Sequence, residues 1–168
     1  MRALFAGLAL LAGATAMAAP ALAQGMGGEW LVEFRERPAA DGGDIRYAIF
    51  NKPGGAVLQL GCTPNRIERV LIRFASNGGP TPNLPRDPAV QYAFDNEAFE
   101  SADWPLFEAG SIEVPRGGKS SAITRRVMSS LRFQVRAQAM DGQWHEADFN
   151  VAGGHQLLRD MLDQCGIR

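Results

Sequence analysis

The sequence predicts an α+β domain that is mostly β: an antiparallel sheet or sandwich-like domain with two short helices, the last one C-terminal. Apolar and polar residues alternate over several short stretches, which is the period of strands with one buried face. Turn signals such as Asp41-Gly42-Gly43 and Asp141-Gly142 separate these stretches and favour tight antiparallel connections. Two short segments show helical spacing instead, which indicates helices packed on the sheet or at its ends.

The N-terminal segment has the three parts of a secretory signal peptide. A positive charge at Arg2 precedes an apolar, small-residue stretch from Ala3 to Ala19, and Ala21-Leu22-Ala23 fits a cleavage site. A membrane anchor is the competing interpretation, but glycine, threonine and proline dilute the stretch and no stop-transfer charge cluster follows. We therefore expect residues 1–23 to be removed, Gln24 to become the first residue and the protein to be periplasmic.

Residues 24–168 have the length of a single domain and are enough to bury a substantial hydrophobic core. Without Arg2 they carry 16 basic and 18 acidic residues, a net charge of −2, which provides no overall basic field for nucleic acid. They contain no second long apolar segment, so we expect no membrane span after cleavage. No motif calls for a cofactor.

Two cysteines in an exported chain suggest a disulfide. Alternation places Cys62 on the same face as Leu58 and Leu60, and helical spacing places Cys165 on the apolar face of the last segment. Both sulfurs are thus expected to point toward a core, and a bridge would contribute about 4–5 kcal/mol in the chain-entropy model. Two separate buried thiols are the alternative.

Most of the chain is expected to form strands joined by turns. Alternating positions predict inward faces at Trp30, Val32 and Phe34; Ile45, Tyr47 and Ile49; Ala56 to Cys62; Val70, Ile72 and Phe74; Val90, Tyr92 and Phe94; and Leu131 to Ala139, with Gln143 to Val151 as a hairpin partner.

The remaining segments are expected to be loops, a short extended piece and the helices. Four prolines and two glycines exclude regular structure from Ser76 to Pro88, and Asn96 to Pro105 is rich in turn signals. Ile112 to Val114 is a short extended piece. A helix capped by Ser120 or Ser121 runs to Met128, and the final helix covers His155 to Gln164.

Catalytic and metal signatures fail on inspection. Gly118-Lys119-Ser120 resembles the end of a phosphate loop, but the required first glycine is Glu113. His145 and His155 are ten positions apart and belong to no metal-ligand pattern, so we expect no metal site. No G-x-S-x-G elbow indicates a hydrolase, although a triad is defined by space and not by order.

Two groups of polar residues remain as candidates. Carboxylates at Glu97, Glu100 and Asp103 lie near Trp104 and Phe107, and paired carboxylates beside an aromatic residue could act on a polysaccharide. The favoured interpretation is a solvated turn whose Trp104 closes the core edge. Two strands each carry an outward arginine pair that would form one anion-binding or partner-docking face if the strands were neighbours; otherwise they are ordinary charges on a wet face. These residues are Arg69, Arg73, Arg132 and Arg136.

The order of features resembles the small periplasmic accessory proteins associated with type VI secretion, the VasI-like group, and related exported proteins of unknown function. The resemblance rests on Trp30, Leu60-Gly61-Cys62, Leu71-Ile72-Arg73-Phe74, Val90 to Asp95, Trp104-Pro105, Leu131 to Arg136, Ala147 to Gly153 and a last helix reaching Cys165. The chain departs from the pattern at Ala93, where a basic residue would be expected. The resemblance implies the disulfide, the periplasm and an accessory role without enzymatic activity.

Three hypotheses follow. The first is a non-enzymatic accessory or binding module of the cell envelope with an envelope protein or polysaccharide partner, acting through a sheet face and the proline-rich loop around Gly78 to Pro88. The second is a cell-wall or polysaccharide hydrolase using the carboxylates near Trp104. The third is a purely structural protein with no coherent pocket or charged patch.

Overall fold

The computed structural model describes residues 31–38, 44–51, 55–74 and 81–167, and it describes side chains from residue 55 onward, except those of Glu68 and Gly153. The predicted signal peptide, Trp30, the turns at 39–43 and 52–54 and the first part of the proline-rich loop lie outside these residues. So do the side chains of the first two strands, for which the sequence predicts inward faces.

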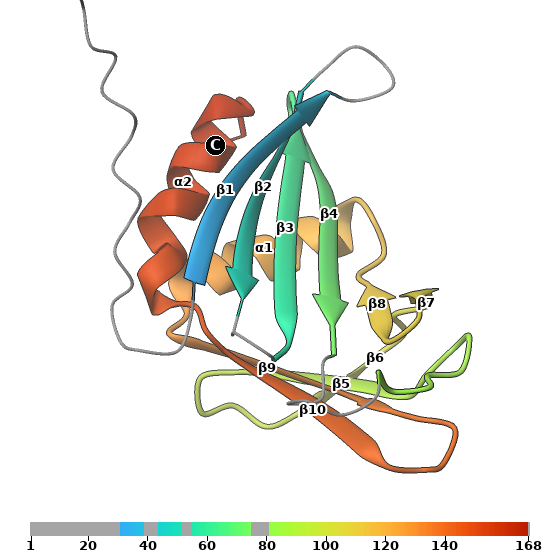
Figure 1. The fold of residues 1–168 in the computed structure, drawn as a ribbon. Coiled ribbons are helices and arrows are strands. Elements are labelled where there is room, and N and C mark those ends of the chain that lie inside the picture. The colour runs from blue at the N-terminus through green and yellow to red at the C-terminus, as the bar shows by residue number, and fades with distance from the viewer. Residues whose placement is uncertain (1–30, 39–43, 52–54, 75–80, 168) are drawn as a thin grey trace, which may run out of the picture.

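Ten strands of the described residues form two antiparallel sheets (Figure 1). The six-stranded sheet has the order β1 (Leu31–Pro38), β2 (Asp44–Asn51), β3 (Val57–Thr63), β4 (Arg66–Arg73), β8 (Ser111–Glu113) and β7 (Leu106–Glu108). The four-stranded sheet has the order β10 (Trp144–Asn150), β9 (Arg132–Gln138), β5 (Val90–Phe94) and β6 (Glu100–Ala102).

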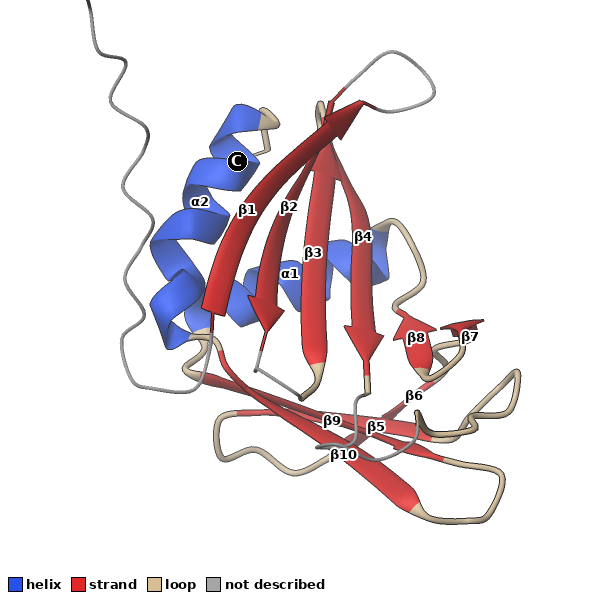
Figure 2. Ribbon diagram, in the orientation of Figure 1, coloured by secondary structure: helices blue, strands red, loops and turns tan. Residues whose placement is uncertain are grey.

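Two helices complete the fold: α1 (Gly118–Ser129) and α2 (His155–Gln164), the latter preceded by a 3₁₀ turn at Ala152–Gly154. In Figure 1 α1 runs behind the long strands and α2 stands at the left, partly behind β1, and Figure 2 shows the four-stranded sheet crossing near one end of these strands. The predicted α+β class, with mostly β structure and a C-terminal helix, is confirmed.

One hydrophobic cluster joins both sheets to both helices. The period-two pattern buries Phe133, Val135 and Ala137 on β9, whereas the residues between them are partly exposed. The helices add apolar side chains at helical spacing, which are Ile123 and Val127 on α1 and Leu158, Met161 and Leu162 on α2.

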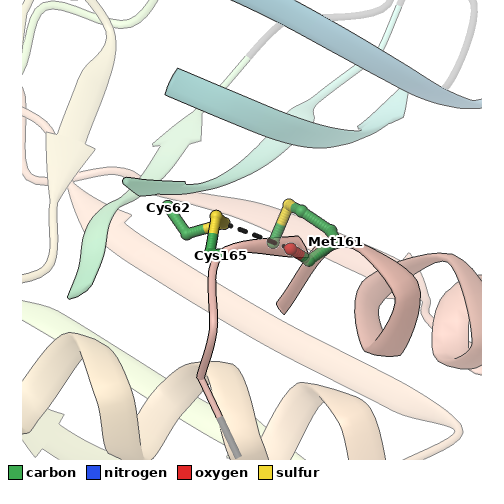
Figure 3. Close-up of a disulfide and its surroundings, with 3 residues drawn as sticks. All are labelled: Cys62, Met161 and Cys165. Carbon is green, nitrogen blue, oxygen red and sulfur yellow. Dashed lines mark hydrogen bonds between the residues drawn. A yellow bond between two sulfur atoms is a disulfide. The ribbon is translucent and has the colours of Figure 1, made fainter. Parts of the chain in front are cut away.

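Cys62 and Cys165 form the predicted disulfide, with an S–S distance of 2.07 Å and 103 positions between them in the chain (Figure 3). The Sγ of Cys62 also lies 3.5 Å from the carbonyl oxygen of Met161. Next to the bridge, the backbone N–H of Asn65 donates to the carbonyl of Cys165 at 2.6 Å. The end of α2 is therefore fastened to the β3–β4 hairpin by a covalent bond and a hydrogen bond.

The described part of the proline-rich loop, residues 81–88, contains no helix or strand, as predicted. It is nevertheless packed against the domain. Leu84 is buried in the core, Met140 donates its N–H to the carbonyl of Asn83, and Leu106 donates to that of Arg86. These contacts anchor the backbone of residues 81–88, while Thr81, Asn83, Arg86 and Asp87 stay exposed.

Local details differ from the sequence predictions in three places. Leu131, which alternation places on the inward face, is 66% exposed because it lies outside β9. Helix α1 begins at Gly118 and not after a serine cap: Ser120 is buried, and its hydroxyl donates to the carbonyl of Gly117. Gly117 has a φ of 87°, a conformation that glycine adopts without strain. The short strands β6 and β7 were not predicted, because three residues are too few to establish an alternating pattern.

Asp95 connects the end of β5 to the start of β9. Its backbone has a φ of 50°, and its Oδ1 accepts hydrogen bonds from the N–H groups of Leu131 at 2.8 Å and Arg132 at 3.0 Å. These two backbone N–H groups lower the pKa of the Asp95 carboxyl below its usual value, because they stabilise the charged form.

We expect loss of the disulfide to lower the free energy of unfolding by about 2–5 kcal/mol, because the unfolded chain regains the freedom that the bridge removes. Urea unfolding of oxidised and reduced protein, and of the Cys62→Ala/Cys165→Ala variant, measures this difference. Equal midpoints for oxidised and reduced protein, or two thiols reacting without reductant, would contradict it.

We expect Asp95 to make stability depend on acid pH. A carboxyl with a depressed pKa in the folded state contributes stability that is complete above the unfolded value of about 3.9 and is lost as pH falls through the lower folded value. Asp95→Asn is the control, because asparagine keeps the acceptor oxygen and tolerates the positive φ but does not titrate. The stability difference between wild type and Asp95→Asn should shrink below about pH 4; a constant difference in urea midpoints across this range would refute the assignment.

Candidate functional site

A pocket of about 230 Å³ lies between the first half of α1 and the β5–β6 edge of the four-stranded sheet. The middle of strand β5 lines the pocket through Tyr92. Strand β6 and the residues after it form one side of the pocket, and α1 forms the other side. The lining residues are Tyr92, Ser101, Ala102, Asp103, Trp104, Lys119, Ala122 and Ile123.

The back wall of the pocket is aromatic and belongs to the core. Trp104 is 3% exposed and stacks on Tyr92, with ring centroids 4.9 Å apart and planes inclined by 20°. Tyr92 in turn meets the ring of Phe94 edge-on at 6.0 Å. Since each ring is held by its neighbour, this wall does not have to be ordered when a ligand binds.

The rim of the pocket is polar. Ser101, Asp103 and Lys119 are exposed and stand around the aromatic wall, with the two charged residues supplied by different elements. The backbone turn at Gly117 sets the start of α1 and thereby the position of Lys119, the second residue of the helix. A wall that binds an apolar ring face, surrounded by groups that bind polar edges, is the usual composition of a small-molecule site.

The predicted carboxylates are distributed unevenly around this pocket. Asp103 lines it. Glu100 accepts a hydrogen bond from the Tyr92 hydroxyl at 2.9 Å, and Glu97 forms an ion pair with Arg126 of α1. Desolvation and the Glu100 hydrogen bond raise the pKa of the Tyr92 hydroxyl, because both disfavour the phenolate.

Trp104 has the predicted place at the core edge, and it also contributes to the pocket wall. Sequence reasoning missed the pocket residues Tyr92, Ser101 and Lys119. Alternation along β5 placed Tyr92 inward but could not show that its neighbour would be Trp104, twelve positions away. Lys119 was considered only as part of a phosphate loop.

The four candidate arginines do not form one face. Arg69 and Arg73 are on β4 in the six-stranded sheet, whereas Arg132 and Arg136 are on β9 in the four-stranded sheet. The condition that these two strands be neighbours is therefore not met. Three of these arginines are paired with acids that sequence alternation could not assign, namely Arg69 with Glu113, Arg73 with Glu108 and Arg132 with Asp148.

Arg136 differs from the other three. Its Nε donates to the Gln91 side-chain oxygen at 2.8 Å, and its guanidinium carbon lies 4.2 Å from the ring centroid of Phe99 and 5.0 Å from that of Trp144. None of these three partners was singled out from the sequence. They come from β5, from the residue before β6 and from β10, which the register brings together across β9.

The two histidines lie apart. His145 is on β10, and the His155 ring nitrogen Nε2 contacts the carbonyl oxygen of Ser130, joining the start of α2 to the end of α1. The described residues hold no group of three potential metal ligands. No helix within the described ranges has the length and apolar character needed to cross a membrane.

Comparison of the chain with protein-family models, curated proteins and solved structures finds no match. The pocket at Trp104 and the Arg136 cluster are therefore judged by their geometry. Of the two, the pocket combines a cavity with both apolar and polar lining groups, which makes it the candidate ligand site.

We expect the Tyr92 hydroxyl to titrate above the usual tyrosine value, and Glu100→Gln to lower its pKa again by removing the neighbouring negative charge. Ultraviolet absorbance of the phenolate during a pH titration measures this in a Tyr47→Phe background, since the chain has only two tyrosines. Glu108→Gln, a carboxylate paired with Arg73, is the matched control. An unchanged Tyr92 titration in Glu100→Gln would contradict the assigned contact.

Proposed function

We propose that this protein is an exported, non-enzymatic binding module of the cell envelope whose ligand enters the pocket at Trp104. The signal-peptide pattern of residues 1–23 supports export, and the disulfide is compatible with an oxidising compartment. The resemblance to the VasI-like accessory proteins supports a periplasmic accessory role, which does not require a working secretion system.

The observation that carries the proposal is the combination of a fixed aromatic wall with a polar rim. Tyr92 is partly exposed and is held by stacking on the buried Trp104, so a ligand meets an aromatic surface that is already ordered. A volume of about 230 Å³ is below the range of drug-sized pockets, and it suits one ring of a larger molecule. A sugar unit of an envelope polysaccharide fits this description, because its C–H face stacks on aromatic rings and its hydroxyls bond to a polar rim.

The same geometry supports binding more than hydrolysis. A glycosidase needs two carboxyl groups that flank the scissile bond. Asp103 is the only one of the three predicted carboxylates that lines the pocket within the described chain. Glu97 and Glu100 are engaged by Arg126 and Tyr92. The hydrolase remains the alternative, with Asp103 as the predicted carboxylate that lines the pocket.

The proposal is tested by filling the pocket from the helix side. Ala122 is exposed and lines the pocket, so Ala122→Trp should occupy it without disturbing the core. We expect this variant to lose most of the binding of mature protein to purified peptidoglycan sacculi, by about tenfold or more, which corresponds to roughly 1.4 kcal/mol. Co-sedimentation followed by quantification of the bound fraction measures the change.

Arg125→Trp is the matched control, because it places the same side chain on an exposed position of α1 that does not line the pocket. Equal loss in both variants, or no binding by wild type, would refute the proposal for this polysaccharide. Release of soluble reducing ends from the sacculi by wild type, abolished by Asp103→Asn, would establish the hydrolase instead.

A further inference from the structure

The outer face of the four-stranded sheet carries Arg136, whose surroundings differ from those of Arg69, Arg73 and Arg132. Register and burial show which face is outward: Phe133, Val135 and Ala137 of β9 are buried, and the alternate residues point away from the core. On β9 and β10 these outward residues are Arg132, Gln134, Arg136, Gln138, Trp144, Glu146, Asp148 and Asn150.

The guanidinium of Arg136 is fixed on this face. Its Nε and one Nη nitrogen both donate to the side-chain oxygen of Gln91. Phe99 and Trp144 contribute their rings at 4.2 and 5.0 Å from the guanidinium carbon. A guanidinium has five N–H groups, so two bonds to one amide oxygen leave donors available for another acceptor. The side chain is thus ordered before any ligand arrives, which removes an entropic cost of binding.

Arg136 also has no carboxylate bonded directly to it among the described residues. Arg69, Arg73 and Arg132 of the two sheets each form an ion pair with a carboxylate, whereas within the described chain Arg136 makes none. Its cross-strand neighbour is Glu146, but the carboxylate of Glu146 accepts a hydrogen bond from Gln134 at 3.3 Å. A planar, immobilised guanidinium with free donors is complementary to a carboxylate.

Trp144 defines what accompanies that carboxylate. It is 42% exposed, although most large apolar side chains of the described residues are buried. Part of the indole is therefore accessible beside the guanidinium. The C–H face of a sugar ring stacks on such a surface, and the side-chain amides of Gln134 and Gln138 on the same face offer partners for hydroxyl groups. An acidic peptide would supply the carboxylate but no rigid ring face for the indole.

We propose that the outer face of the four-stranded sheet, centred on Arg136, Trp144 and Gln91, binds acidic glycans of the uronic-acid type. The carboxylate bonds to the guanidinium edge of Arg136, and the sugar ring lies against Trp144. This surface is distinct from the Trp104 pocket. The two are joined by β6, since Ser101 lines the pocket and is the register partner of Gln91. The inference does not depend on the function proposed for the pocket.

The test uses tetragalacturonic acid as the probe and isothermal titration calorimetry as the measurement, with the mature, disulfide-bonded protein. We expect Arg136→Lys to weaken binding by about tenfold, because lysine keeps the charge but loses the planar fork, which is the equivalent of one charge-assisted hydrogen bond. Arg132→Lys is the matched control on the same strand and face, where the arginine is already paired with Asp148; its affinity should stay within about twofold of wild type.

Ligand and site controls show whether the carboxylate is required and which surface it occupies. Maltotetraose, which has no carboxylate, should bind at least about tenfold more weakly than the acidic probe. Ala122→Trp, which fills the Trp104 pocket, should leave tetragalacturonate binding unchanged. In wild type, the side-chain NMR signals of Arg136 Nε and of the Trp144 indole should shift when the probe is added. The same shifts in Arg132→Lys and Ala122→Trp would show that these variants are folded and keep the site.

The inference would be overturned by no tetragalacturonate binding by wild type, by equal losses in Arg136→Lys and Arg132→Lys, or by a glutamate tetrapeptide that binds as tightly as the sugar. The last result would assign the surface to acidic peptides. Loss of binding in Ala122→Trp alone would place the acidic glycan in the Trp104 pocket and leave only the function proposed for that pocket.

Discussion

A series of aromatic contacts along the inner face of the four-stranded sheet determines the rest of the structure. It runs from Trp104 to Tyr92 at 4.9 Å, to Phe94 at 6.0 Å, to Phe133 at 4.7 Å and to Phe149 at 6.2 Å. These rings come from β5, β9 and β10 and from the segment after β6, so the series connects three of the four strands and the segment that follows the fourth. Buried aromatic rings contribute large apolar areas together with preferred packing geometries. The pocket wall is the end of this series, and its rigidity is that of the core.

The second constraint acts at the opposite end of the domain, where α2 meets β3. The disulfide joins Cys62 to Cys165 beside buried Met161 and Leu162, so the covalent bond reinforces an apolar contact. His155 contacts the Ser130 carbonyl at the other end of the same helix and links α2 to α1. Helix α1 supplies one side of the pocket. The position of that side therefore depends on the contact between α1 and α2, and on the disulfide that holds α2 to the sheet.

The sequence was sufficient for features that depend on local patterns. Alternation located β3, β5 and β9 within a residue or two, helical spacing located α2, and the compartment argument paired the cysteines. It was insufficient wherever strand order mattered, because alternation assigns faces and not neighbours. The arginine pairs show this: each lies on one strand as predicted, but β4 and β9 belong to different sheets. The pocket was missed for the same reason, since Lys119 and Trp104 meet only through the tertiary fold.

The distribution of charge on the two sheets then gives Arg136 its significance. Exposed ion pairs such as Arg73 with Glu108 contribute little to stability. They do neutralise the charge of the arginine and orient its N–H donors toward the carboxylate. Arg136 is oriented by Gln91 and two rings, and in the described chain no carboxylate forms an ion pair with it. A purely structural role would be served equally well by an apolar side chain between Phe99 and Trp144, which would cover the same sheet face without placing a partly desolvated charge there. A fixed guanidinium at this position is what a carboxylate ligand requires.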